Sequence, residues 1–163
     1  MYEHIKFKNA INMRKANYDK FPSTKLTGML VQGWDSIISM LKKKMDARKV
    51  LAVDLYTGVY EEEVLDAFSK EFSGRVMNVR DLMKPEKEIQ TLTERFMTED
   101  VLFGYVTNLK LEDYLDADKV AAARKQISEA KETIVIIGTG AAVVAPQDAM
   151  VVYADMARWE IQQ

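Results

Sequence analysis

Short apolar runs alternate along this chain with longer segments whose apolar residues recur every three or four positions. The runs VLAVDL (50–55) and TIVIIG (133–138) have the length and the β-branched residues of buried strands. Segment 34–45 instead places its apolar residues on one face of a helix, at Trp34, Ile37, Ile38, Leu41 and Met45. The alternation predicts an α/β fold, a three-layer sandwich in which helices cover a mainly parallel central sheet.

The same reading extends to the rest of the chain. Strands are predicted at 49–56, 75–79, 133–138 and 149–155. Helices are predicted at 34–45, 61–72, 85–97 and 116–131. Asp116 and Asp118 are alternative N-caps for the last of these helices. VLFGYV (101–106) fits either a short strand or a tight loop, and GTGAAVVAPQD (138–148) fits a loop with room for one helical turn.

The 163 residues suit one domain preceded by an arm. Residues 1–30 lack a sustained period and are predicted to form an irregular N-terminal arm with a short strand at IKF (5–7). Residues 31–163 are predicted to form a single α/β domain. MARWEIQQ (156–163) is expected to begin a helix that the end of the sequence interrupts, which indicates a domain excised from a longer chain.

Charge and composition exclude several classes of function. With a net charge of -2 and a pI near 5.6, the chain has no overall basic field to hold nucleic acid or an anionic membrane. No stretch reaches the roughly 20 apolar residues of a membrane helix. The absence of cysteine excludes disulfides, thiolate metal sites and a cysteine nucleophile, and fits a cytoplasmic protein. His4 is the only histidine, so no histidine-based zinc site or catalytic triad is expected, and no metal or cofactor is predicted.

The segment VLAVDLYTGVYEEEVLDAF (50–68) has the strand, turn and helix of a phosphate-binding loop without its chemistry. The signature G-x-x-x-x-G-K-[ST] needs glycines for close approach, a lysine for phosphate charge and a hydroxyl for magnesium. Here Leu55 and Tyr60 stand at the glycine positions, and Glu61 and Glu62 stand at the lysine and hydroxyl positions. Two carboxylates there repel a triphosphate, so this degenerate Walker A segment is not expected to bind ATP. Asp54, at the end of the predicted strand, is the best polar candidate at that edge.

The segment IVIIGTGAAV (134–143) begins like a dinucleotide-binding fingerprint but has Val143 at the third glycine position. About a dozen residues, interrupted by Pro146, then lead to the next strand, which leaves little room for a crossover helix. A tight loop at the strand end is therefore the favoured interpretation. Its backbone N–H groups could hold a small anion if this loop and the first one share a sheet edge. The candidate ligand-binding residues are Asp54, Thr57, Gly58, Gly138, Thr139 and Gly140.

Five segments together resemble a known domain: NYDKFPS, VLAVDLYTGVYEEEVL, TEDVLFGYVTNLKLEDYLDADKVAAARKQI, VIIGTGAAVVAP and YADMARWEIQ. The resemblance is to the N-terminal domain that precedes the catalytic cupin in some class I mannose-6-phosphate isomerase-like proteins, and it covers nearly the whole chain. More distantly, the order of elements is similar to uridine-kinase-like P-loop folds. The resemblance implies a cupin isomerase domain as the partner in the parent chain and a role in sugar-phosphate metabolism.

No catalytic residue is carried over from either resemblance. The isomerase chemistry of that family belongs to a zinc-binding cupin barrel, and the kinase lysine is missing here. The first interpretation is therefore a non-catalytic accessory domain, regulatory or assembling, attached to an isomerase. The alternatives are a divergent small-molecule kinase or phosphotransferase that uses Asp54 and the GTGAA loop, and a purely structural oligomerisation domain that forms a homo-oligomer.

Overall fold

A computed structural model of the chain describes residues 23–25, 27–100 and 102–157. The chain divides into two units, Met1–Leu30 and Val31–Gln163, and the fold below is that of the second unit. His4, the strand predicted at 5–7 and most of the helix predicted at 156–163 lie outside the described residues. Among the described residues, no helix combines the length and the apolar character needed to cross a bilayer.

Strands and helices alternate as the sequence predicts. The strands are β1 Val50–Leu55, β2 Arg75–Asn78, β3 Ile134–Gly138 and β4 Met150–Ala154. The helices are α1 Trp34–Met45, α2 Glu61–Glu71, the 3₁₀ helix η1 Val79–Leu82, α3 Glu86–Glu94, α4 Leu111–Tyr114, α5 Ala117–Glu129 and α6 Ala141–Val144. The helical turn expected within 138–148 is therefore present as α6.

All the strand pairs are parallel, and the strands lie in the order β2-β3-β1-β4. Asp54 of β1 is in register with Gly138 of β3 on one side and with Tyr153 of β4 on the other. The chain passes from β3 to β4 across the position of β1. The connection needs only residues 139–149, so a single turn of helix is enough. The prediction of an α/β fold with a parallel central sheet is confirmed.

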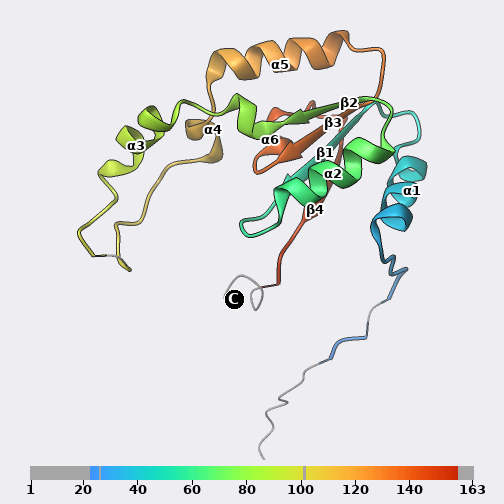
Figure 1. Cartoon of the computed structure of the whole chain (residues 1–163), viewed down its shortest axis with the longest axis horizontal. Helices are drawn as coiled ribbons and strands as arrows, with labels where there is room; N and C mark the ends of the chain where they lie inside the picture. Colours follow the sequence, from blue (N-terminus) through green and yellow to red (C-terminus); the bar gives the residue numbers. More distant parts are fainter. Residues whose placement is uncertain (1–22, 26, 101, 158–163) are drawn as a thin grey trace, which may run out of the picture. The chain divides into compact units, whose positions relative to one another are not determined.

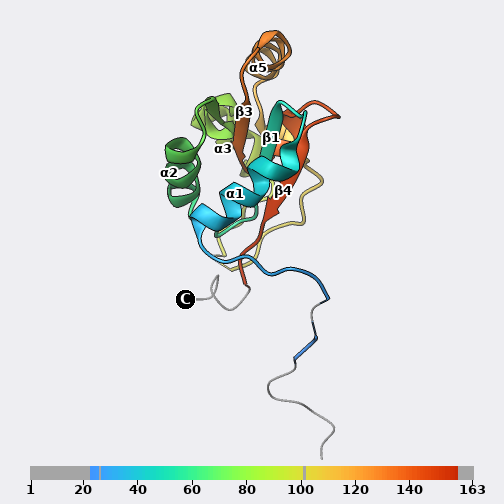
Figure 2. The same cartoon turned by 90° about the vertical axis from the view of Figure 1, so that its right-hand side faces the viewer.

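The two faces of the sheet are covered by different helices (Figures 1 and 2). Successive strand residues point to opposite faces. In β1, Leu51 and Val53 pack with α1 and α2, while Val50 and Ala52 pack with η1, α5 and α6. At the two central strands, β1 and β3, both faces are buried, so these strands read as continuous apolar runs. This arrangement confirms the three-layer sandwich.

The layer formed by α5 and α6 covers less of the sheet than the layer formed by α1 and α2. Met150 and Val152 of β4 pack against the α1 and α2 side of the core. On the opposite face of the same strand, Val151 and Tyr153 are 54% and 59% exposed. Since α6 has four residues, it does not extend over this edge strand.

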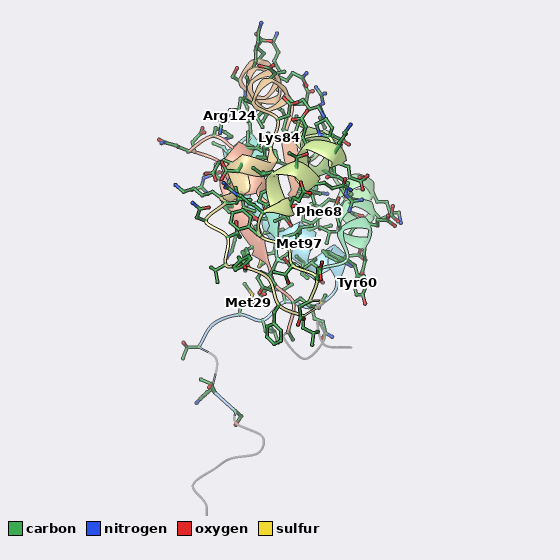
Figure 3. The ribbon with its side chains drawn as sticks, turned by 90° about the vertical axis from the view of Figure 1, so that its left-hand side faces the viewer. Met29, Tyr60, Phe68, Lys84, Met97 and Arg124 are labelled. Carbon is green, nitrogen blue, oxygen red and sulfur yellow. The ribbon has the colours of Figure 1, made fainter. Side chains whose placement is uncertain are left out.

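Residues 84–114 form an excursion from the sandwich between η1 and α5. It is closed at its base by an isolated antiparallel bridge between Met83 and Leu115 and by the Lys84 N–H, which donates to the Tyr114 carbonyl at 3.0 Å. Figure 3 labels Lys84 at this base and Met97 beyond α3. The helix predicted to reach residue 97 ends at Glu94.

The tip of the excursion is a loop and not a strand. The Asp100 carboxylate accepts hydrogen bonds from the N–H groups of Leu102 and Phe103, at 2.8 and 3.2 Å, which bends the chain tightly. The loop alternative for 101–106 therefore holds for the described residues 102–106. Five large apolar side chains of this tip are each at least 69% exposed, namely Met97, Leu102, Phe103, Tyr105 and Val106.

The structure decides between the two predicted N-caps of α5. The Asp116 carboxylate accepts from the N–H groups of Asp118 and Lys119, at 3.0 and 3.1 Å, so Asp116 is the cap. At the other end of the domain, Met156 and Ala157 are not helical. The prediction of a helix starting at Met156 is wrong for these two residues, where the Asp155 side chain accepts from the Met156 N–H at 2.8 Å.

Asp46, just after α1, has a backbone conformation that favours glycine, with φ of 49° and ψ of -119°. We expect Asp46→Gly to raise the free energy of unfolding by about 1 kcal/mol, because a non-glycine residue in such a region is strained by 1–3 kcal/mol. Urea denaturation measures the change. The neighbouring Ala47→Gly substitution is the matched control and should be neutral or destabilising. If Asp46→Gly instead lowers the free energy of unfolding as Ala47→Gly does, the backbone at Asp46 is not strained.

Candidate functional site

The carboxyl ends of β1 and β3 meet at one edge of the sheet, and their connections leave toward opposite faces. The chain after β1 leads to α2, while the chain after β3 leads to α6 on the other face. In α/β sheets a ligand crevice lies where adjacent connections diverge in this way. The two loops singled out in the sequence are therefore neighbours, as an anion site shared between them requires.

The Asp54 carboxylate bridges this crevice with two hydrogen bonds. Its Oδ1 accepts from the Gly140 N–H at 3.2 Å, and its Oδ2 accepts from the Ala142 N–H at 2.9 Å. A third bond crosses in parallel, from the Thr139 hydroxyl to the Leu55 carbonyl at 2.9 Å. The backbone donors that could hold an anion thus bind the chain's own carboxylate, which caps the start of α6.

The two glycines of the GTG segment have local reasons to be glycine. Gly138 has a φ of 134°, and a Cβ atom there would lie 2.9 Å from the Val79 Cβ. Gly140 is left-handed, with a φ of 88°, where the chain turns into α6. Glycine is therefore required at both positions by the local backbone, where η1 and α6 pack against the end of β3, and a ligand is not needed to explain it.

Thr57 and Gly58 lie in the neighbouring turn, whose central residues are exposed. The Val59 N–H closes the turn by donating to the Tyr56 carbonyl at 3.2 Å, and Gly58 adopts a φ of 98°. Of the six predicted site residues, the structure thus joins Asp54, Thr139 and Gly140 directly. Gly138 ends β3 directly before this loop and packs closely against Val79.

The first turn of α2 is tied to other elements through its glutamates. Glu61 accepts from Asn78 Nδ2 at 2.8 Å and pairs with Arg80 at 3.2 Å. Glu63 accepts from the indole N–H of Trp34 at 2.9 Å. Sequence reasoning missed Asn78 and Arg80. Their only sequence signal is that they are polar residues at the carboxyl end of β2, where Asn78 ends the strand and Arg80 lies in η1.

A tyrosine pair borders this edge on the side of β4. The rings of Tyr56 and Tyr153 meet edge to face, with centroids 6.4 Å apart. Desolvation, followed by the nearby Asp155, Tyr56 and Asp54, raises the pKa of the Tyr153 phenol, so this hydroxyl stays neutral at physiological pH. Nowhere in the described ranges do three His, Asp or Glu side chains gather as a bound metal ion requires.

A parallel α/β sandwich whose switch-point crevice is bridged by its own carboxylate defines the class of this domain. The chain belongs to the family described as Domain of unknown function (DUF8485), which matches residues 33–163. Neither the curated proteins nor the solved structures compared with the chain gave a match.

Asp54→Ala removes the acceptor of two backbone N–H groups. We expect the free energy of unfolding to fall by about 2 kcal/mol, because hydrogen bonds to a charged group contribute about 1.5–3 kcal/mol and the Gly140 N–H would stay partly buried without its acceptor. Asp54→Asn keeps one acceptor oxygen and should lose less. Urea denaturation measures both variants.

Asp66→Ala is the matched control for Asp54→Ala. Asp66 pairs with Lys70 on the exposed face of α2, so its loss should change stability by less than about 0.5 kcal/mol. Equal losses in the Asp54 and Asp66 variants would contradict the structural role of Asp54.

Proposed function

We propose that residues 31–163 form a non-catalytic accessory domain of a cytoplasmic mannose-6-phosphate isomerase-like protein of sugar-phosphate metabolism, with a regulatory or assembly role. The observation that carries the non-catalytic assignment is the Asp54 carboxylate, which accepts from the Gly140 and Ala142 N–H groups. The link to an isomerase comes from the family resemblance, because in that family a C-terminal cupin domain carries the isomerase chemistry.

Asp54 bears directly on the alternative of a divergent kinase or phosphotransferase with a P-loop-like fold. Phosphoryl transfer depends on backbone donors and cations placed around the phosphates. Here the carboxylate of Asp54 accepts from the backbone donors, and Glu61, which the sequence aligns with the Walker A lysine, is bonded to Asn78 and Arg80. An incoming phosphate would have to displace one carboxylate and approach another. The geometry therefore favours the accessory role.

The exposed tip of the excursion supports an assembly role. Its five apolar side chains, Met97 to Val106, are each at least 69% exposed. Apolar groups that gather on a surface mark contacts with other proteins more often than they mark chemistry. We assign this tip as the surface that contacts the cupin domain. The same tip would serve the third interpretation, a purely structural oligomerisation domain, if its partner were a second copy of the chain.

Activity assays test the non-catalytic assignment. Incubated with mannose 6-phosphate, or with ATP, Mg²⁺ and sugar or nucleoside acceptors, the 163-residue chain should give no product above the buffer rate. Phosphoryl transfer that Asp54→Asn abolishes and Asp66→Asn preserves would overturn the proposal in favour of the kinase alternative. Isomerisation of mannose 6-phosphate by the chain alone would overturn it as well.

Sedimentation with a catalytic cupin of a mannose-6-phosphate isomerase-like protein tests the assembly surface. We expect a complex that a Leu102→Ser and Phe103→Ser double variant weakens about tenfold or more, because truncated anchors at an interface centre cost over 1 kcal/mol each. A Val151→Ser and Tyr153→Ser variant, with apolar groups exposed on β4, is the control and should bind normally. Self-association of the chain that is lost in the tip variant, without a cupin complex, would instead establish the oligomerisation domain.

A further inference from the structure

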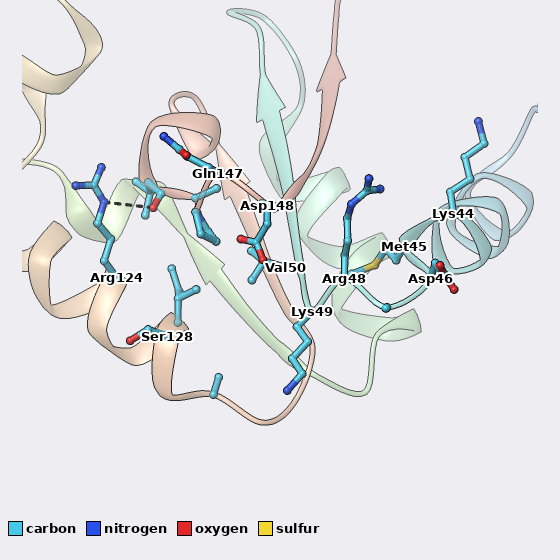
Figure 4. Close-up of a pocket in the computed structure, with 17 residues that line it drawn as sticks. Lys44, Met45, Asp46, Arg48, Lys49, Val50, Arg124, Ser128, Gln147 and Asp148 are labelled. Atoms are coloured by element: carbon cyan, nitrogen blue, oxygen red, sulfur yellow. Dashed lines mark hydrogen bonds between the residues drawn. The ribbon is translucent and has the colours of Figure 1, made fainter.

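A cavity of about 1040 Å³ opens at the amino edge of the sheet, opposite the edge that holds Asp54. Three segments that are distant in sequence line it (Figure 4): residues 44–50, the last turns of α5 from Arg124, and residues 144–149. The cavity is a consequence of the short α6. Between α6 and β4 the chain runs as a loop instead of a longer helix, and a hollow remains between this loop, α5 and the start of β1.

The floor of the cavity is apolar. Val50, Ile127 and Val144 contribute to it, and each also belongs to the hydrophobic core on this side of the sheet, with at most 8% of its surface exposed. Such a floor is fixed in place by core packing. It offers a dry surface against which the organic part of a ligand can be buried.

The rim of the cavity is positively charged. It carries four cationic side chains and two carboxylates, an excess of two positive charges in a chain whose net charge is -2: Lys44, Arg48, Lys49 and Arg124, with Asp46 and Asp148. The ion pairs found within the described residues include none of these six. In a concave site with apolar walls, such an excess attracts anions.

Arg124 is held in position without being neutralised. Its Nη2 donates to the Val143 carbonyl at 2.7 Å and its Nε to the Val144 carbonyl at 3.5 Å, at the end of α6. Because both acceptors are uncharged, the guanidinium keeps its charge, and within the described part of the chain its Nη1 has no hydrogen-bond partner. In Figure 4, Arg124 lies on one side of the cavity, and Arg48 and Lys49 lie on the other.

We propose that this cavity binds a phosphate monoester whose organic group lies over the apolar floor and presents polar atoms to the rim, for example a nucleoside monophosphate. The phosphate dianion balances the excess of two charges and is bound by arginine and lysine. The organic group lies over the small exposed parts of Val50 and Ile127. The Gln147 and Ser128 side chains, which also line the cavity, offer polar contacts to it. The volume suits a ligand of this size and far exceeds that of inorganic phosphate. This site does not depend on the proposed accessory function.

Calorimetric titration of the 163-residue chain with AMP tests the site. We expect AMP to bind, and adenosine and inorganic phosphate each to bind about tenfold more weakly or not at all, since each has only half of the recognised chemistry. AMP binding should also weaken as salt is added. No heat of binding up to about 5 mM AMP would overturn the proposal. Phosphate that binds as tightly as AMP would overturn the role of the apolar floor.

Substitutions locate the binding site. The Arg48→Gln and Lys49→Gln double variant should reduce AMP affinity about tenfold or more, because it removes two charges from the rim. Lys43→Gln, which removes one charge from the exposed face of α1 outside the cavity, should leave affinity unchanged. AMP binding that the double variant preserves, or that Lys43→Gln weakens equally, would refute the cavity as the site. If Asp54→Asn abolishes AMP binding and the double variant does not, AMP binds at the carboxyl edge and the proposed cavity is wrong.

Discussion

The carboxylate of Asp54 is the interaction on which the carboxyl edge of this domain depends. It joins the end of β1 to the loop after β3 by two hydrogen bonds, across a sequence separation of 86 and 88 residues. β1 and β3 are the two central strands of the sheet, so the bond pair fixes the point where the chain turns from the sheet into α6. The carboxylate accepts hydrogen bonds from the backbone N–H groups of the loop, as a bound anion does in a phosphate-binding protein. Because it is part of the chain, it does not dissociate.

The short connection from β3 to β4 has a second set of consequences. Because α6 is a single turn, the helical layer on this face stops before the edge strand and before the start of β1. The exposed Val151 and Tyr153 on β4 and the cavity between α5 and residues 144–149 both follow from this missing cover. A longer crossover helix would bury both regions. One constraint on chain length thus produces an apolar strip and a charged cavity on the same face.

The sequence was sufficient for the strands of the sheet and the long helices, but not for the short helices η1 and α4 or for the contacts between elements. Periodicity located all four strands and the long helices, because β-branched runs and helical stripes report local burial. Asp54 was singled out because it ends a strand, yet its partners depend on which strands pair, and a sequence pattern does not carry that information. The same holds for the bonds from Asn78 and Arg80 to Glu61. The cavity was missed entirely, since its lining comes from three segments that become neighbours only in the folded domain.

The distribution of charge separates the two edges of the sheet. At the carboxyl edge, the carboxylates of Asp54 and Glu61 accept hydrogen bonds from groups within the domain. At the amino edge, four cations surround an apolar floor, and among the described residues none of them forms an ion pair. An anion therefore meets repulsion at the edge where the fold usually binds ligands and attraction at the opposite edge. A phosphate group is therefore attracted to the amino edge, beside Arg48, Lys49 and Arg124.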